Sequence, residues 1–263
     1  RQLHVSCSWI SMKKVKDNFS VQSKGYKKFR PEYPSSLLEE ILRHVEKRDS
    51  CWDCATGNGQ IAIEMANHFQ TIVASDISQE QLENAPVTDN LEYVKCRAEK
   101  TPFADDSFDL ITVGQAAHWF DFDPFNKEVN RVLKNNGIVA IIGYGLMYGD
   151  RSFNDKLLQF YDGEIGAYWD VERKHIDAHY SSIPFPFDPI ELSTKYSIDV
   201  QWSLAQLEGY LNTWSSVNRY IQKNGENPIP AFVGDLSSSG VWNGFELKNL
   251  HFPLFVKLGR VIK

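Results

Sequence analysis

The sequence predicts a doubly wound α/β fold, a mainly parallel sheet with helices on both faces, followed by a largely helical region. Three observations support this prediction. Short apolar runs typical of strands alternate with amphipathic helical patterns through the first 145 residues. A turn of small residues follows the first of these runs directly, and the alternation stops after Gly149.

The strands of the first half are predicted from short apolar runs. We expect them over residues 50–54, 71–75, 91–96, 108–113 and 138–142. Most segments between them have apolar residues at i, i+3 and i+4 spacing, as does the helix after Pro34. Because crossovers between parallel strands are right-handed, this repeated unit predicts a doubly wound sheet.

The second half has a different pattern. Apolar and aromatic residues over 153–168 predict one long helix, and a proline-rich stretch follows at 184–189. A strand is expected near 191–200 and a capped helix from Ser203, before a last β-like stretch at 245–258.

The predicted organisation has three parts. They are a core with an N-terminal clasp at 12–145, a mostly helical cap at 146–240, and the final strands that complete the sheet at 241–263. The core is taken to begin at Met12, which resembles a natural start. A cap inserted late in an open sheet is well placed to cover the crevice at the strand ends. Its aromatic residues either roof that crevice or only fill the core of the extra helices.

The composition is that of an ordinary globular protein, with 42% hydrophobic and 24% charged residues among 263. The net charge of −6 argues against a nucleic-acid partner, because a dedicated nucleic-acid binder shows an excess of basic residues. No apolar run approaches the roughly 18 residues of a membrane span. The four cysteines are too few for a disulfide framework. We expect a cytoplasmic protein with neither a membrane nor a nucleic-acid partner.

The most informative segment is Cys51–Gly59, where a predicted strand leads into a turn of small residues and then a helix. Glycines let a backbone approach a ligand closely, and a helix N-terminus favours an anionic group. A second acidic residue, Asp76, ends the next strand 23 residues beyond Asp53. A carboxylate at that position can accept hydrogen bonds from both hydroxyls of a ribose.

Two classes of cofactor fit this segment. Gly57-x-Gly59-x-x-Ala62 matches the dinucleotide fingerprint, whereas acid-x-small-x-Gly-x-Gly from Asp53 is typical of S-adenosylmethionine sites. Asp53 favours the second class, because a carboxylate is unfavourable beside a pyrophosphate but attracts the ammonium group of S-adenosylmethionine. An NAD-dependent oxidoreductase and a non-catalytic cofactor-binding module are the alternatives.

Further motifs occur in the order and spacing of a known family. Asp53–Gly59 is followed by Ser75-Asp76, Ala98–Phe103, Asp106–Asp109 and Arg131–Gly137. Together they resemble the class I S-adenosylmethionine-dependent methyltransferases, in the type 11 group that holds the ubiquinone/menaquinone-biosynthesis and trans-aconitate methyltransferase-like enzymes. The segment Gly114–Asp121 narrows the resemblance to the trans-aconitate-like branch, as do Phe19, Tyr26 and Arg30–Pro34.

The resemblance implies a Rossmann-like, doubly wound seven-stranded sheet with a mostly helical cap after strand five. It also implies methyl transfer from S-adenosyl-L-methionine to a small-molecule acceptor. Asp53 would hold the methionine end of the cofactor, Arg30 would pair with its carboxylate and Asp76 would bind the ribose. The residues implied around the cofactor are Tyr26, Arg30, Asp53, Ala55, Thr56, Gly57, Asn58, Gly59, Asp76, Ile77, Ala98, Glu99, Gly114 and Gln115.

Two residues depart from the family pattern. Ala55 stands where glycine is usual. Arg97 stands where many relatives have an acidic residue that accepts a hydrogen bond from the adenine amino group, and a guanidinium cannot accept that bond.

The acceptor side has fewer markers. His118 is the candidate catalytic residue, either as a base or substrate-orienting group or as a packing residue beside Trp119. A carboxylate acceptor needs no base, whereas an amine or hydroxyl does. Trans-aconitate-like enzymes esterify polycarboxylates, so cationic groups are expected in the pocket, with Arg151, Arg173 and Arg219 as candidates.

Redox and metal sites are the remaining alternatives. Cys51-x-x-Cys54 has redox spacing, but it lies within a predicted strand rather than at the start of a helix, which favours a structural role. No second such motif is present for zinc, and the other histidines lack metal-binding spacing, so no metal is expected.

Overall fold

The computed structural model describes residues 29–263, so Phe19, Tyr26 and most of the expected N-terminal clasp lie outside the described residues. The elements of the first half are α2 (Ser35–Arg43), β1 (Ser50–Cys54), α3 (Gln60–Met65), β2 (Thr71–Asp76), α4 (Gln79–Glu83), β3 (Leu91–Lys95), β4 (Phe108–Gly114), the 3-10 turn Ala117–Trp119, α5 (Phe122–Val132) and β5 (Leu133–Tyr144). Those of the second half are α6 (Arg151–Leu158), the π-helical turn Gln159–Glu164, the 3-10 turn Gly166–Tyr168, α7 (Arg173–Asp177), β6 (Asp188–Pro189), β7 (Ser197–Trp202), α8 (Leu204–Leu211), α9 (Ser215–Asn224), α10 (Ile229–Ser238) and β8 (Lys248–Arg260).

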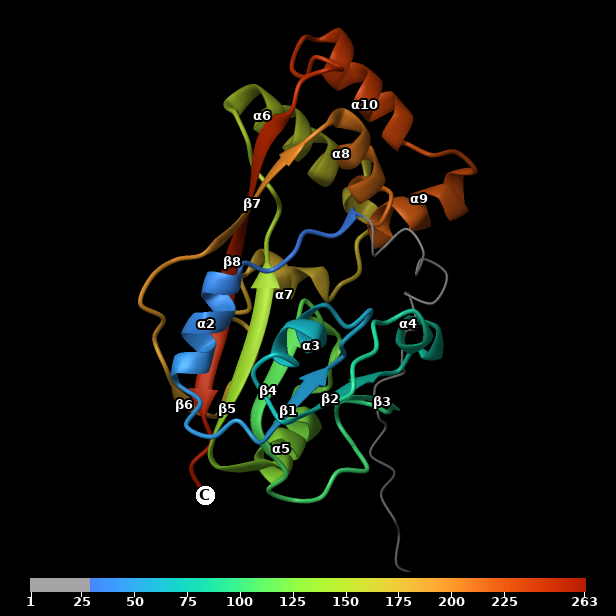
Figure 1. The fold of residues 1–263 in the computed structure, drawn as a ribbon. Helices are drawn as coiled ribbons and strands as arrows, with labels where there is room; N and C mark the ends of the chain where they lie inside the picture. The colour runs from blue at the N-terminus through green and yellow to red at the C-terminus, as the bar shows by residue number, and fades with distance from the viewer. Residues whose placement is uncertain (1–28) are drawn as a thin grey trace, which may run out of the picture.

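The strands form one twisted sheet in the order β3-β2-β1-β4-β5-β8-β6 (Figure 1). The first five strands pair in parallel, and β8 pairs with β5 in the antiparallel direction. This path of seven strands confirms the predicted doubly wound fold. An eighth strand, β7, pairs only with β8.

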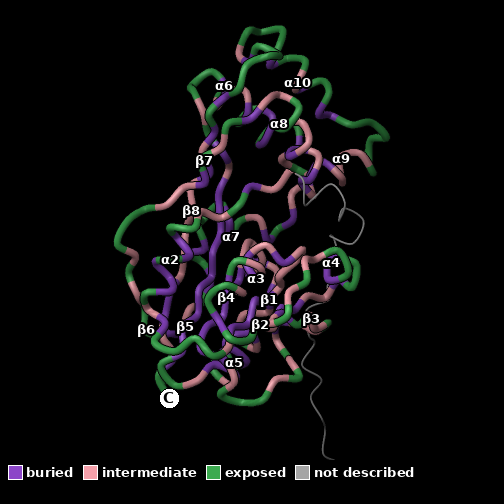
Figure 2. The backbone as a smooth tube through the Cα atoms, in the orientation of Figure 1, coloured by how far each residue is buried: buried purple, intermediate pink, exposed green. Residues whose placement is uncertain are grey.

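The two faces of the sheet are covered by separate apolar clusters, because successive strand residues point to opposite faces. Leu110 and Ile138 pack in one cluster with the apolar residues of α2 and α3. Their neighbours Ile111 and Val139 pack in the other with α5. Figure 2 shows the resulting buried band along the central strands.

The cap has its own apolar cluster, which is rich in aromatic rings. Phe153 and Trp242 are both fully buried there, and their rings meet edge to face with centroids 5.7 Å apart. β8 joins this cap to the sheet: its residues 248–253 pair with β7, and residues 254–260 pair with β5 (Figure 1). One strand therefore contributes to both parts.

Three elements of the second half differ from the expectation. The strand expected at 191–200 is β7, which begins at Ser197 and lies off the seven-strand path. The edge position beside β8 is taken by the two-residue β6, inside the proline-rich stretch. Pro189 suits an edge because it has no N–H to donate. The final strands expected over 241–263 are the single strand β8.

The long helix expected over 153–168 is also interrupted. It ends at Leu158 and continues as a π-helical and then a 3-10 turn. Gly163 and Gly166 lie in these turns, and glycine weakens a regular helix by about 1 kcal/mol relative to alanine. Within residues 29–263, none of the helices has the length and apolar character that a membrane crossing requires.

Candidate active site

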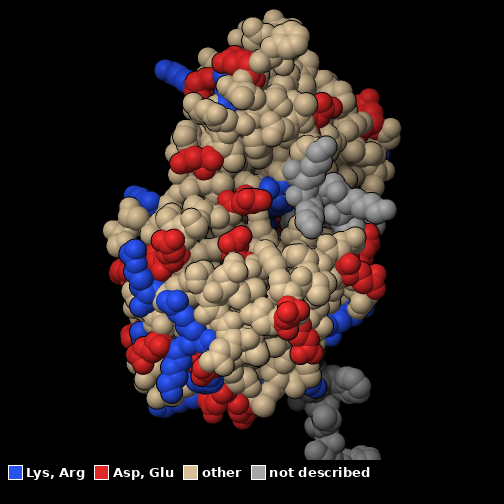
Figure 3. Space-filling model, in the orientation of Figure 1, with Lys and Arg blue, Asp and Glu red and all other residues tan. Residues whose placement is uncertain are grey.

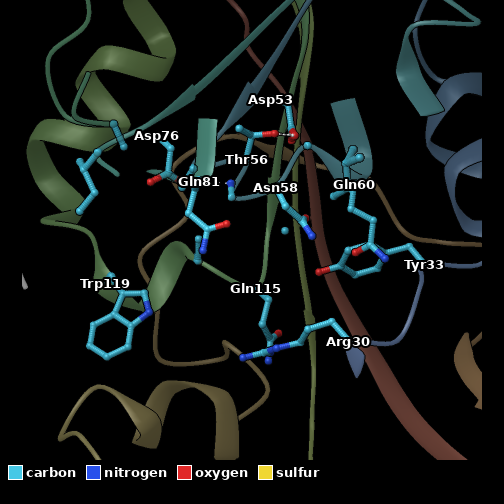
Figure 4. A pocket seen from close by; sticks show the side chains of 18 of the residues that line it. Arg30, Tyr33, Asp53, Thr56, Asn58, Gln60, Asp76, Gln81, Gln115 and Trp119 are labelled. Carbon is cyan, nitrogen blue, oxygen red and sulfur yellow. Dashed lines mark hydrogen bonds between the residues drawn. The ribbon is translucent and has the colours of Figure 1, made fainter. Parts of the chain in front are cut away.

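A cavity of about 340 Å³ lies at the carboxyl ends of β1, β2 and β4. Open α/β sheets bind ligands at this edge, because the loops after parallel strands converge there. Figure 4 shows polar side chains from separate loops surrounding it, among them Asp53, Asp76 and Gln115. The predicted cofactor residues that line it are Arg30, Asp53, Ala55, Thr56, Gly57, Asn58, Gly59, Asp76, Ile77, Ala98, Glu99, Gly114 and Gln115.

The loop between β1 and α3 turns through three left-handed residues, Ala55, Gly57 and Gly59, with φ of 55°, 57° and 79°. The two glycines have different surroundings. A Cβ added to Gly59 would lie 2.6 Å from the Tyr93 hydroxyl, whereas one added to Gly57 would meet no protein atom within 4 Å. Neighbouring side chains therefore restrict position 59, whereas position 57 faces open space beside the cavity that it lines. Ala55 tolerates a conformation that favours glycine.

Asp53 is the penultimate residue of β1 and is almost fully buried, with 1% of its surface exposed. Thr112 donates to one carboxylate oxygen at 2.7 Å and Thr56 to the other at 2.5 Å (Figure 4). Burial raises the pKa of Asp53 from 3.8 to about 6, and the two threonine hydrogen bonds oppose that shift. The carboxylate is held in an environment that favours a cationic ligand group.

Asp76 ends β2 and connects two loops. One carboxylate oxygen accepts a hydrogen bond from the backbone N–H of Gly57 at 2.9 Å, and the other accepts one from Ser78 at 2.8 Å. The side chain thus fixes the glycine turn while lining the cavity. The Ser78 side chain also caps α4, because its hydroxyl accepts a hydrogen bond from the backbone N–H of Gln81.

The loop after β3 contains the second departure from the family pattern. Arg97 lines the cavity, and its Nε donates to a Glu99 oxygen at 3.1 Å. The other Glu99 oxygen accepts from the backbone of Asp121 at 3.1 Å. The positive charge of Arg97 is therefore neutralised by Glu99, one of the predicted cofactor residues.

The other end of the cavity is formed by Arg30, Gln115 and Tyr144. The amide of Gln115 is clamped to the Tyr144 backbone: its Nε2 donates to the carbonyl at 3.0 Å, and its Oε1 accepts from the N–H at 2.8 Å. Arg30 donates to the Tyr144 hydroxyl at 2.5 Å. Both Arg30 and Gln115 line the cavity at this end. These contacts fix the wall that separates the cavity from the cap.

A second, smaller cavity of about 60 Å³ lies on the cap side of this wall. It shares Arg30, Gln115, Trp119 and Tyr144 with the first cavity, so the two adjoin. The rest of its lining comes from the core and the cap together: His118, Gly145, Leu146, Trp169, Asp170, Arg173, Ile176, Tyr210, Thr213, Trp214 and Ser215. Both uses expected for the cap's aromatic residues therefore occur, because Trp169 lines the cavity whereas Phe153 fills the cap core.

Of the three candidate cations, only Arg173 lines this cavity. Its guanidinium lies 4.6 Å from the centre of the Trp169 ring, and its Nε donates to the Tyr161 hydroxyl at 2.6 Å. Arg219 is not part of the lining but forms an ion pair with Asp170, which is. Arg151 is 95% exposed on α6 and lines neither cavity.

His118 lies in the 3-10 turn after β4 and lines the second cavity rather than the first. Its side chain is buried, and Nδ1 lies 3.0 Å from the hydroxyl of Tyr180. The predicted catalytic histidine thus lies beside the second cavity, and its Nδ1 forms a hydrogen bond with Tyr180.

Comparisons with known proteins give this arrangement a family. A family model described as a methyltransferase domain matches residues 52–141. A Dictyostelium discoideum protein, provisionally named a methyltransferase, is 34% identical over 253 residues, which cover 94% of this chain and 96% of the relative. A solved structure from Anaeromyxobacter dehalogenans, provisionally described as a type II methyltransferase, has a TM-score of 0.81 and 29% identity, covering 89% of this chain and 99% of the other.

This chain belongs to the class I S-adenosylmethionine-dependent methyltransferases. Its cofactor is S-adenosylmethionine, which sets aside the NAD-dependent oxidoreductase. The YcgJ protein of Bacillus subtilis shares the fold alone, with a TM-score of 0.52 and 19% identity over 88% of this chain and all of that one.

The methyltransferase cavity also includes residues that sequence reasoning did not assign. These are Pro31, Glu32, Tyr33, Leu38, Gln60, Ile61, Ile63, Glu64, Gln81, Pro86, Cys96, Arg97, Ala116, Trp119, Phe120, Tyr144 and Glu172. Tyr33 and Trp119 lay within segments that carried the family resemblance, which was a usable signal. Tyr144 and Glu172 lay outside every quoted motif, so only the fold brings them to the site.

The cysteine pair of the methyltransferase is structural. Cys51 and Cys54 are free and buried in β1, and they belong to the apolar clusters on opposite faces of the sheet. Burial raises the pKa of both thiols, which disfavours the reactive thiolate. Among residues 29–263, no group of three His, Cys, Asp or Glu side chains is placed to hold a metal ion.

Proposed function

We propose that this methyltransferase transfers a methyl group to a carboxylate of a small molecule held between the core and the cap. The observation that carries the proposal is the second cavity, which adjoins the cofactor cavity and contains two arginines among aromatic rings. The resemblance of Gly114–Asp121 to trans-aconitate-like enzymes supports the same acceptor class.

In the first cavity, we propose that Asp53 and the loop Ala55–Gly59 hold the methionine end of the cofactor, with Arg30 near its carboxylate. Asp76 would bind the ribose, and Ile77, Ala98 and Glu99 would surround the adenine. The buried carboxylate of Asp53 fits an ammonium group, and the open space at Gly57 fits a ligand in close contact with the backbone. Gly114 and Gln115 would lie nearest the methyl group.

The electrostatics of the second cavity favour an anionic acceptor. Arg30 and Arg173 line it. Arg173 also forms an ion pair with Asp177 at 3.3 Å, and the one acidic residue of the described lining, Asp170, forms one with Arg219. The indole N–H of Trp169 is buried and has no hydrogen-bond acceptor among residues 29–263. An unsatisfied buried N–H costs about 1–3 kcal/mol. A carboxylate oxygen of the acceptor would supply the missing partner.

The size of the second cavity supports a small acceptor. A volume of about 60 Å³ corresponds to roughly four to six water molecules, which suits a carboxylate with a short carbon chain. On the face shown in Figure 3, acidic side chains are spread over the molecule, and the basic ones gather near α2. The net charge of −6 and this spread of acidic side chains do not suit a polyanionic nucleic acid. The described cysteines Cys51, Cys54 and Cys96 are unpaired, which supports a reducing compartment such as the cytoplasm.

When bound, S-adenosylmethionine supplies an electrophilic methyl group on a sulfonium. A carboxylate is ionised at neutral pH, so its oxygen can attack the methyl carbon as the C–S bond breaks, and no proton moves. The protein then contributes alignment and exclusion of water. Arg173 and Trp169 would orient the acceptor, and the wall of Gln115 and Tyr144 would fix the line of transfer.

The test is a transfer assay with S-adenosylmethionine carrying a labelled methyl group, across small carboxylic acids, phenols and amines. The proposal expects base-labile methyl esters from the carboxylic acids. Arg173→Gln should raise the acceptor KM about tenfold or more, the loss of one charge-assisted contact. Arg151→Gln removes an exposed cap arginine and should leave the acceptor KM unchanged.

The affinity for S-adenosylhomocysteine, measured by calorimetry, should be the same in both arginine variants. Transfer to phenols or amines alone would overturn the carboxylate proposal. Tight binding of the cofactor without transfer to any acceptor would instead favour the non-catalytic module.

A further inference from the structure

The hydrogen bond between His118 and Tyr180 joins two segments far apart in the chain. His118 follows β4, and Tyr180 follows α7 of the cap region. Their side chains are 3.0 Å apart at Nδ1 and the phenolic oxygen, with the His118 residue 5% exposed and Tyr180 fully buried. The pair is therefore shielded from water.

This contact determines which ring nitrogen of His118 carries the proton. A buried tyrosine hydroxyl needs an acceptor, and within residues 29–263 Nδ1 of His118 is the acceptor in reach. Burial raises the pKa of Tyr180, although Arg173 and the backbone N–H of His118 oppose the shift, so the phenol keeps its proton. Nδ1 then accepts, and the proton of the neutral imidazole is on Nε2.

The reverse arrangement is less favourable. If Nδ1–H donated to the phenolic oxygen, the Tyr180 proton would have no acceptor in the described part of the chain. An unsatisfied buried donor costs about 1–3 kcal/mol. That cost corresponds to roughly a 5- to 150-fold preference for the Nε2–H tautomer.

The backbone around Tyr180 shows that its position is specified. His179 and Tyr180 are consecutive non-glycine residues with φ of 49° and 57°, a left-handed conformation that residues with a Cβ rarely adopt. The Tyr180 ring packs edge to face on the ring of Phe255 in β8, with the ring centroids 4.8 Å apart. The backbone N–H of Tyr180 donates to the carbonyl of His175 at 2.7 Å. The fold sustains this strain at the residue that contacts His118.

We propose that Tyr180 is a positioning residue that holds His118 as the Nε2–H tautomer. In this form His118 acts on the acceptor as a hydrogen-bond donor and not as a general base. The inference rests on the proposed function, because it assigns His118 a role that suits an acceptor that is already ionised. An Nε2–H donor stabilises a carboxylate oxygen, whereas a neutral hydroxyl acceptor would need a ring nitrogen able to take its proton.

The tautomer can be measured directly, without an acceptor. Two-bond ¹H–¹⁵N correlation spectra of protein labelled at histidine nitrogen distinguish the two tautomers, and His118→Gln assigns the signals. We expect the Nε2–H pattern for His118 in the parent protein near pH 7.5. Tyr180→Phe should shift it toward a mixture of tautomers. Tyr220→Phe, which removes a hydroxyl bonded to Glu164, should leave it unchanged. An Nδ1–H pattern in the parent protein would overturn the proposal.

A kinetic arm tests the donor role once an acceptor is known. His118→Gln keeps an N–H donor near the position of Nε2 but cannot act as a base, and His118→Leu does neither. A donor role predicts kcat/KM within about tenfold of the parent for the Gln variant and a loss of roughly 100-fold for the Leu variant. Equal losses in both would show that His118 is a base. Failure of the carboxylate screen with the Nε2–H pattern intact would refute the acceptor class and not the tautomer.

Discussion

The two cavities are built in different ways. The first cavity, where we propose that the cofactor binds, is lined mainly by loops that follow strands, and carboxylates such as Asp53 and Asp76 are bonded to the turn around Gly57. The second cavity is lined by large aromatic rings and arginine side chains that pack on one another, as Arg173 does on Trp169. Loop positions fixed by a sheet suit a ligand that must always bind in one pose. Side chains packed on side chains can change acceptor preference without disturbing that sheet.

The largest effect should come from a bulky residue at Gly57. Gly57→Val should reduce S-adenosylhomocysteine affinity by at least about 100-fold, because the side chain would enter the cavity. The matched control is Gly225→Val in the cap, where φ is 79° and an added Cβ also meets nothing. Both variants should lose about 1–2 kcal/mol of unfolding free energy.

Calorimetric titration and chemical denaturation measure the two quantities. Affinity should fall only for the Gly57 variant. Equal affinities in two folded variants would mean that the cofactor does not contact this turn.

A smaller loss is expected when Asp76 is removed. Asp76→Ala should weaken S-adenosylhomocysteine by about 2–3 kcal/mol, roughly 30- to 150-fold, because a charge-assisted bond to the ribose is lost. Asp155→Ala removes an exposed carboxylate of the cap and should not change the affinity. An Asp76 variant within a factor of two of the parent would contradict the ribose assignment.

The smallest effect concerns pH. The pKa of Asp53 is raised to about 6 by burial, so the carboxyl takes up a proton as the pH falls below that value. If the ionised form holds the ammonium group, cofactor affinity should fall about tenfold from pH 7 to pH 5. Asp53→Asn should bind more weakly at pH 7 and lose this dependence. A parent protein with flat affinity over this range would argue against the contact.

The same group has the opposite effect on the stability of the free protein. Because the native pKa lies above the usual 3.8, burying the ionised carboxylate costs stability that grows as the pH rises from about 4 to 6. Asp53→Asn should therefore gain stability relative to the parent over that window, by up to about 3 kcal/mol. Urea denaturation at a series of pH values measures this difference.

Much of the first cavity followed from the sequence because strand ends converge. Once the strands before Asp53, Asp76 and Gly114 were recognised, the parallel sheet brought their carboxyl ends to one edge. The second cavity was not predictable in this way. Its wall depends on pairs such as Arg30 with Tyr144 and His118 with Tyr180, 114 and 62 residues apart.

The strand errors have a related cause. β6 is two residues long and contains a proline, so it carries no alternating apolar pattern. Its place in the sheet depends on pairing with β8, which follows in the chain only after β7 and three helices. Local pattern cannot specify such a partner.

The central claim is that a cofactor bound in the first cavity places its methyl-bearing sulfur beside the second cavity, beneath the cap. A crystal structure with S-adenosylhomocysteine tests it most directly. We predict the ribose hydroxyls within hydrogen-bonding distance of Asp76, and the sulfur at the wall of Gln115 and Tyr144, facing the cavity that contains His118 and Arg173. A sulfur directed away from that wall, with the homocysteine part of the ligand leaving between α3 and α4, would contradict the claim. The acceptor would then bind elsewhere.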